Sequence, residues 1–230
     1  MPTVTNAKNI KPTSIQEGKK HLILCEGNDD EQFFNCYLKS AAFSGHDVSA
    51  VQVVQFCGKD NLRNFLRSLA NAESFSQLES LLIVRDADTN IISARDSVKG
   101  AFEAINLHAP TAEYEWNCDG SIKTGFLLMP SCNDKSQTGA LEDLCWKILS
   151  DKFGVSTCTD VERFIDSLEQ SGKRTYTHKN KAFVHTYFSS TDELIAASIG
   201  RAAQAGAFDW ASPELDTLHD FIVGMLTNHS

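Results

Sequence analysis

The sequence predicts an α/β fold: a parallel sheet with flanking helices and a helical C-terminal extension. Three short apolar segments, residues 21–25, 50–56 and 80–85, are each followed by a polar turn and then by apolar residues at helical spacing. A short, continuous apolar run is typical of a strand buried on both faces. Strands that alternate with helices form parallel sheets with right-handed connections. These three units therefore define the core of the predicted fold.

Polar residues end each predicted strand and begin the helix that follows. After the first strand, the Glu-Gly pair at 26–27 stops the apolar run, and Asn-Asp-Asp at 28–30 offers N-cap chemistry. The first and third helices are expected over residues 31–42 and 91–105. The second is indicated by an apolar stripe at positions 62, 65, 66 and 69.

The strand–helix alternation ends after residue 106. Two further strands are expected at 114–116 and 124–129, followed by a polar loop at 130–138. The rest of the chain predicts helices over residues 140–153, 160–169, 182–187, 192–205 and 213–226. We therefore expect a flexible leader at 1–18, an α/β domain at 19–156 and a helical extension at 157–230 that packs on it.

Composition and charge exclude several classes of protein. The chain has 230 residues, of which 42% are hydrophobic, so it can bury a core without disulfide or metal staples. It contains no apolar stretch near the ~18 residues of a membrane helix and no apolar segment in its first twenty residues, so we expect a cytoplasmic protein without membrane contact. A net charge of -9 disfavours broad adhesion to nucleic acid, so any such contact is expected at local basic patches.

The cysteines do not predict a disulfide framework or a zinc ribbon. There are seven, and they are scattered without a C-x-x-C pair. We expect reduced thiols that behave as small hydrophobic core residues.

Acidic residues gather where the predicted strands end. Glu26 and Asp30 follow the first strand, Asp86 and Asp88 follow the third, and Glu142 opens the helix after the polar loop. Taken singly, each is more often a helix cap or a turn residue than a metal ligand. Together they meet at the edge of a parallel sheet where ligands bind, and carboxylates gathered there repel each other unless a divalent cation is present. The pattern therefore predicts a Mg²⁺ or Mn²⁺ site.

The same acids carry a resemblance to a known domain. The strings EGNDD at 26–30 and DAD at 86–88, each after an apolar strand, resemble the Toprim domain of topoisomerases, bacterial primases and OLD-type nucleases. The strings TGALEDLCW at 138–146, KNKAFVHTY at 179–187 and GRAAQAGAFDW at 200–210 are similar to stand-alone bacterial Toprim-like proteins catalogued as a domain of unknown function. The resemblance covers about residues 20–226 and implies a Toprim-like Rossmannoid sheet.

The resemblance also implies roles for single acids. Glu26 and Asp30 match the first acidic motif, and Asp86 and Asp88 match the D-x-D metal ligands. Glu142 is the candidate for a further acid that helps to hold a second metal ion in OLD-type nucleases. The implied activity is two-metal hydrolysis of phosphodiesters in DNA or RNA, and the OLD resemblance extends this to phage defence.

Basic residues complete the implied site. A later lysine assists at the scissile phosphate in OLD-type nucleases, and Lys181 is the first choice for it, with Lys179 second. Glu26 and Lys181 are thus the expected catalytic residues. Lys59, which follows Gly58 after the second strand, and the two later lysines are the expected contacts to nucleic acid.

Arg85 departs from the pattern, because it stands in a predicted buried strand directly before the D-x-D motif. A small or apolar residue is expected there. A structural ion pair is the expected use of this side chain, since buried charges normally have a partner; contact with a phosphate is the alternative.

Two other functions remain as alternatives. The first is a non-catalytic Toprim-like subunit that binds metal or nucleic acid and works with a separate ATPase, since the chain has no Walker A motif. The second is a phosphatase related to the haloacid dehalogenases, which Asn at position 90 and the late position of the D-x-D motif disfavour. The helical C-terminal third offers a surface for a homo-oligomer.

Overall fold

The computed structural model describes residues 15–130, 138–153 and 155–227, and within them a five-stranded sheet of order β2-β1-β3-β5-β4. β1 pairs in parallel with β2 and β3, and β3 pairs in parallel with β5. The short β4 pairs antiparallel with β5 at the sheet edge. The predicted α/β fold with a mostly parallel sheet is confirmed. The strands are β1 (His21–Cys25), β2 (Val51–Gln55), β3 (Ser80–Asp86), β4 (Trp116–Asn117) and β5 (Lys123–Met129).

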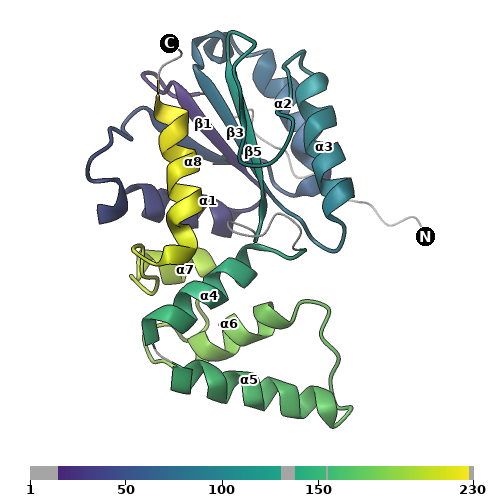
Figure 1. Ribbon diagram of the computed structural model, residues 1–230, viewed down its shortest axis with the longest axis vertical. Coiled ribbons are helices and arrows are strands. Elements are labelled where there is room, and N and C mark those ends of the chain that lie inside the picture. The colour runs from purple at the N-terminus through teal and green to yellow at the C-terminus, as the bar shows by residue number, and fades with distance from the viewer. Residues whose placement is uncertain (1–14, 131–137, 154, 228–230) are drawn as a thin grey trace, which may run out of the picture.

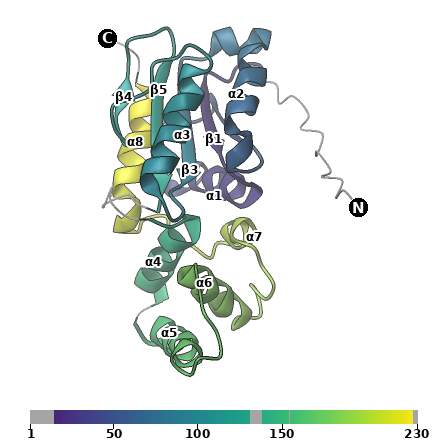
Figure 2. The same ribbon diagram turned by 90° about the vertical axis from the view of Figure 1, so that its right-hand side faces the viewer.

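Helices cover both faces of the sheet and extend beyond one end of it. Figures 1 and 2 show α2 and α3 on one face and α8 on the other, with α4, α5 and α6 beyond the end. The helices are α1 (Asn28–Leu38), α2 (Leu62–Ala70), α3 (Ile91–Glu103), α4 (Leu141–Phe153), α5 (Val155–Gln170), α6 (Lys179–Ser189), α7 (Ile199–Gln204) and α8 (Asp216–Leu226). Four 3₁₀ turns lie at Ala41–Phe43, Lys59–Asn61, Glu73–Gln77 and Pro213–Leu215.

Alternation along the strands gives two separate cores. In β3, Leu82 and Val84 belong to the core formed with α1, α8 and the helices α4 to α7. Leu81 and Ile83 belong to the core formed with α2 and α3. Neighbouring strands keep the same alternation, as the pairing of Ile83 with Phe126 illustrates. Because successive side chains of a strand point to opposite faces, consecutive residues at the end of β3 enter different environments.

Two local expectations are wrong. The first helix starts at Asn28 and is capped by Gly27, rather than by the Asn-Asp-Asp sequence, because the Asp30 carboxylate turns back to accept a bond from the Gly27 N–H at 3.1 Å. The expected helix at 192–205 shrinks to α7, which begins at the Ser198 cap. Before it, the Ser190 and Thr191 hydroxyls donate to carbonyls of α6, which favours turns over helix.

The cysteine prediction holds only in part. Cys25, Cys145 and Cys158 are buried free thiols, as expected of core residues. Cys57 and Cys118 are exposed. Cys57 has a positive φ of 62°, so the chain turns sharply after β2 and points this residue away from the core.

Parts of the predicted leader and polar loop, residues 1–14 and 131–137, lie outside the described residues. At the end of the leader, Ile15 is buried in the core beneath α2 and α3. Among the described residues, no helix combines the length and apolar character needed to cross a membrane.

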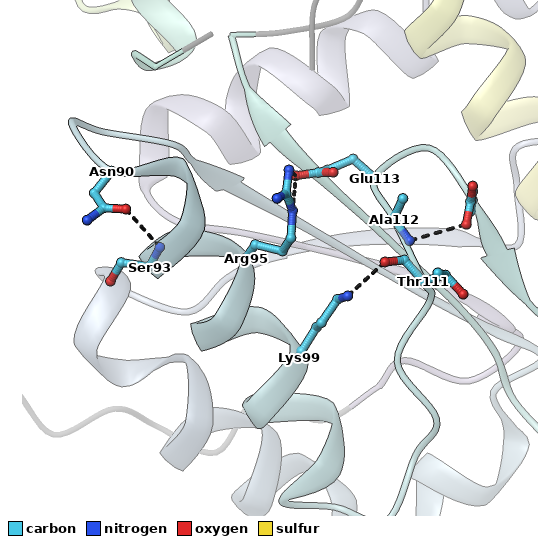
Figure 3. A network of polar contacts seen from close by, with 8 residues as sticks. Asn90, Ser93, Arg95, Lys99, Thr111, Ala112 and Glu113 are labelled. Atoms are coloured by element: carbon cyan, nitrogen blue, oxygen red, sulfur yellow. Dashed lines mark hydrogen bonds and ion pairs between the residues drawn. The ribbon is translucent and has the colours of Figure 1, made fainter. Parts of the chain in front are cut away.

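Polar contacts fix α3 against the segment that leads to β4 (Figure 3). Arg95 forms an ion pair of 2.7 Å with Glu113, whose side chain is only 4% exposed. The Lys99 ammonium donates to the Thr111 carbonyl at 2.7 Å. The helix is thus held at two successive turns, and its N-terminus has a fixed position near the end of β3.

A close contact between two strands supplies a stability prediction. A Cβ atom at Gly125, in the middle of β5, would lie 2.6 Å from Cζ3 of Trp116 on β4. We expect Gly125→Ala to lower the free energy of unfolding by about 1–3 kcal/mol, because the indole must move out of a packed position. Urea unfolding followed by tryptophan fluorescence measures the change.

Gly100→Ala in α3 is the matched control, because its new methyl group meets nothing within 4 Å. Alanine favours the helix over glycine, so this variant should gain about 0.5–1 kcal/mol. An unchanged Gly125→Ala protein would contradict the tight packing of β4 on β5.

Candidate functional site

All five predicted metal ligands line one cavity of about 530 Å³ at the carboxyl end of the sheet, together with Lys181. The ligands come from the connection after β1 and the first turn of α1, from the end of β3 and the turn after it, and from the first turn of α4. This is the edge of a parallel sheet where loops and helix N-termini converge. We call this cavity the acid pocket; its acidic residues are Glu26, Asp29, Asp30, Asp86, Asp88, Glu142 and Asp143.

Glu26 is held by one carboxylate oxygen and leaves the other free. Its Oε1 accepts a hydrogen bond of 3.2 Å from the Lys59 backbone N–H. Its Oε2 is buried and has no hydrogen-bond partner within the described part of the chain. Burial raises the pKa of Glu26, and repulsion from Asp88 raises it further. A buried carboxylate oxygen without a donor is unfavourable, so this atom favours a cationic or proton-donating ligand.

Asp30 and Asp86 are the most perturbed acids of the pocket. Burial raises the pKa of Asp30 to about 7, and repulsion from Glu26 and Glu142 adds to it. The pKa of Asp86 lies well above its usual range, mainly through burial and then through repulsion from Asp30 and Glu26. Asp86 also accepts a 3.1 Å hydrogen bond from the Leu141 N–H, which ties the start of α4 to the end of β3.

Two of the carboxylates are paired with lysines. The Lys59 ammonium lies 2.7 Å from Asp88, and the Lys181 ammonium lies 2.8 Å from Glu142. These bonds raise the pKa of both lysines. Lys59 comes from the turn after β2 and Lys181 from α6, so residues far apart in the sequence neutralise part of the pocket.

Asp29 and Asp143 also line the acid pocket, and we did not predict them as site residues. Asp29 accepts a hydrogen bond from the Gly200 N–H of α7 at 3.0 Å, and Asp143 accepts one from the Asn180 amide of α6 at 2.7 Å. Their position beside predicted ligands in the sequence was the available signal. Both attach helices of the C-terminal part to the walls of the pocket.

Lys179 is not brought to the acid pocket. It forms ion pairs with Asp166 and Glu169 of α5 at 2.7 and 2.6 Å, which raise its pKa to about 12. Between the two candidates for the later lysine, the structure therefore brings only Lys181 to the acids.

Arg85 does not form the ion pair expected of it. The residue is only 7% exposed, and its Nε and Nη1 atoms are buried without a hydrogen-bond partner in the described ranges. It lines a second cavity that adjoins the acid pocket at Asp88.

The donor atoms of the acid pocket are of the chemical type that a hard divalent cation prefers. They are carboxylate oxygens, the ligands that Mg²⁺ and Mn²⁺ prefer, and the unpartnered Oε2 of Glu26 is one of them. Among the described residues, however, no three His, Cys, Asp or Glu side chains already stand close enough to hold a metal ion. The lysine pairs of Asp88 and Glu142 occupy two of the donors, so a cation would have to displace them.

The raised pKa of Asp30 predicts an unusual pH dependence of stability in the metal-free protein. Between the unfolded value of 3.8 and the folded value of about 7, the folded state binds more protons, so the free energy of unfolding falls as the pH rises through this window. Asp30→Asn removes the charge and keeps an acceptor for the Gly27 N–H. In EDTA at pH 8, we expect the variant to be more stable than wild type by about 2 kcal/mol, and the difference to vanish near pH 4.

Thermal and urea unfolding at several pH values measure this effect. Asp96→Asn, at an exposed position of α3, is the control and should keep the wild-type profile. A difference between Asp30→Asn and wild type that stays constant from pH 4 to pH 8 would contradict the repulsion argued here.

Comparisons with known proteins place the chain in a family. No curated protein matches it. Three solved structures of the C-terminal region of the OLD protein of Xanthomonas campestris pv. campestris, phased with iodine, mercury and platinum, are similar to it at TM-scores of 0.43, 0.44 and 0.43 and 12–13% identity. They cover 90% of this chain and 94–96% of theirs. The family described as "Protein of unknown function (DUF3226)" matches residues 20–227. The chain therefore belongs to the DUF3226 family.

Proposed function

We propose that the acid pocket catalyses metal-dependent hydrolysis of phosphodiesters in DNA or RNA, as a Toprim-type nuclease. The observation that carries the proposal is the burial of Asp30 and Asp86 with raised pKa values in one cavity with three further predicted ligands. Buried acids that repel each other destabilise a fold, and perturbed acids in a cleft mark functional sites. Their gathering at this edge is explained if divalent cations bind between them.

The proposed ligands divide into two groups. Asp86 and Asp88 would hold one cation, Glu26 and Asp30 the other, and Glu142 would complete the set. Mg²⁺ or Mn²⁺ bound there supplies Lewis acidity, which lowers the pKa of bound water and stabilises the leaving oxygen.

The protein's own side chains have separate tasks in this proposal. Glu26 offers a free, buried Oε2 and a raised pKa, so it is suited to orient the attacking water and to accept its proton at that atom. The Lys181 side chain is 59% exposed, so its ammonium can turn from Glu142 to a phosphate oxygen and stabilise charge there. Lys59, in the turn after β2, would do the same when its ammonium leaves Asp88.

The alternative is a non-catalytic subunit that binds metal or nucleic acid and acts with a separate ATPase. The lysine pairs of Asp88 and Glu142 favour it, because the ammonium groups neutralise two acids without a metal ion. In that case Lys179, held by Asp166 and Glu169 on α5, belongs to the helical part and its contact with nucleic acid would lie away from the acid pocket.

The nuclease proposal is tested with the double variant Asp86→Asn/Asp88→Asn on supercoiled plasmid, linear DNA and structured RNA. We expect wild-type protein to cleave one of them with Mg²⁺ or Mn²⁺ and to be inactive in EDTA. The double variant should lose about a hundredfold or more of the rate, because it removes two ligands of a proposed metal ion that would stabilise charge at the reacting phosphate. Its fold should persist, since asparagine at position 86 can still accept from the Leu141 N–H.

Asp96→Asn removes a charge at an exposed site outside the pocket and should cleave like wild type. Full activity of the double variant would contradict the assignment of the metal ligands.

Metal binding is measured separately from cleavage. We expect Mn²⁺ to raise the melting temperature of wild type, since a ligand at a hundredfold excess over its Kd stabilises the folded state by about 2.7 kcal/mol. The double variant should not respond. A shift in wild type without cleavage of any substrate would favour the non-catalytic subunit, and no shift at all would contradict the proposed metal site.

A further inference from the structure

A second cavity, of about 480 Å³, lies beside the acid pocket on the face of the sheet covered by α2 and α3. The two cavities share Asp88. We call the second one the Arg85 pocket; the side chains relevant here are Lys59, Arg63, Arg85, Thr89, Ser93 and Ser97. Its lining is thus basic and rich in hydroxyl groups, unlike that of its neighbour.

Arg85 is the central observation. It lies at the end of β3 on the same face as Leu81 and Ile83, which is the face of α2 and α3. It is 7% exposed, and its Nε and Nη1 atoms have no hydrogen-bond partner in the part of the chain described here. A buried guanidinium always carries its charge, and leaving it unpaired costs free energy. An anion with several oxygen acceptors would remove this cost.

The other walls of the pocket favour an anion as well. Three cations line it against two carboxylates, and one of these carboxylates, Asp88, is already paired with Lys59. Ser93 and Ser97 offer hydroxyl donors from the first two turns of α3, a helix of 13 residues whose positive N-terminal end points to this side. The contacts of Arg95 and Lys99 hold this helix in place (Figure 3).

We propose that the Arg85 pocket binds a phosphate group of the nucleic-acid strand that the acid pocket cleaves. Arginine binds phosphate through charge-assisted hydrogen bonds, and Nε and Nη1 of Arg85 are two donors without a partner among the described residues. The inference rests on the proposed function, because it supplies the strand. Lys59, which bonds Asp88 through its ammonium and Glu26 through its backbone N–H, stands between the two pockets. A phosphate beside it fixes the strand next to the carboxylates.

The test measures phosphate binding in EDTA, where the acid pocket holds no cation. The probes are inorganic phosphate, with chloride at equal ionic strength as reference, and single-stranded oligonucleotides with and without a 5′-phosphate. Thermal shift and calorimetric titration are the readouts. We expect a saturable response of wild type to inorganic phosphate and to both oligonucleotides.

Three variants identify the pocket. Arg85→Met should lose the response to phosphate and keep or raise the melting temperature without ligand, because it removes an unpaired buried charge. Arg63→Gln, at an exposed position of α2 that lines the pocket, should weaken phosphate binding about tenfold. Arg67→Gln, one turn later on the same helix and outside the pocket lining, is the matched control and should bind like wild type.

The proposal is overturned if wild type responds to phosphate no more than to chloride, or if Arg63→Gln and Arg67→Gln bind alike. Arg85-dependent binding of inorganic phosphate without binding of either oligonucleotide overturns the assignment to a strand. Binding only of the 5′-phosphorylated oligonucleotide narrows the ligand to a strand end and supports the proposal. Phosphate binding in EDTA without cleavage in Mg²⁺ or Mn²⁺ counts against the nuclease, not against the pocket.

Discussion

Repulsion between the carboxylates gathered at one edge of the parallel sheet is the interaction that the other groups of the site must offset. Asp30 is buried and Asp86 is partly buried, and the carboxylates of Glu26 and Glu142 raise the pKa of both. The fold compensates with backbone N–H donors from Gly27 and Leu141 and with ammonium groups from Lys59 and Lys181. These groups come from separate segments, so the folded chain is needed to keep the acids together.

The alternation of side chains along β3 explains why two different cavities lie side by side. Arg85 and Asp86 are consecutive, and a strand directs consecutive side chains to opposite faces. Arg85 therefore joins α2 and α3, while Asp86 joins the start of α4. One short segment separates a basic cavity from an acidic one, and Asp88 beyond it borders both.

The helical part beyond the sheet completes the acid pocket. α6 supplies Lys181 to Glu142 and Asn180 to Asp143, and α7 approaches α1 so closely that the Gly200 N–H bonds Asp29. The packing of Trp146 of α4 on Phe183 of α6, with ring centroids 5.2 Å apart, sets where α6 lies. The pocket thus depends on packing between helices that are distant in sequence.

The sequence by itself determined the features that local patterns encode. The apolar runs predicted β1, β2, β3 and β5, and because parallel strands bring their carboxyl ends to one edge, the five predicted acids meet in one cavity. The metal, the substrate and the role of each acid stay proposals. The sequence indicates a bound ligand only through the chemistry of the residues that would contact it.

Only the tertiary structure decided which charges find partners. Lys179 and Lys181 are equivalent in the sequence, yet one side of α6 meets α5 and the other meets the acid pocket. Arg85 was expected in an ion pair, but its Nε and Nη1 atoms have no partner among the described residues, while Asp143 was overlooked and holds α6. Such pairings join residues far apart in the chain, so neither spacing nor local propensity specifies them.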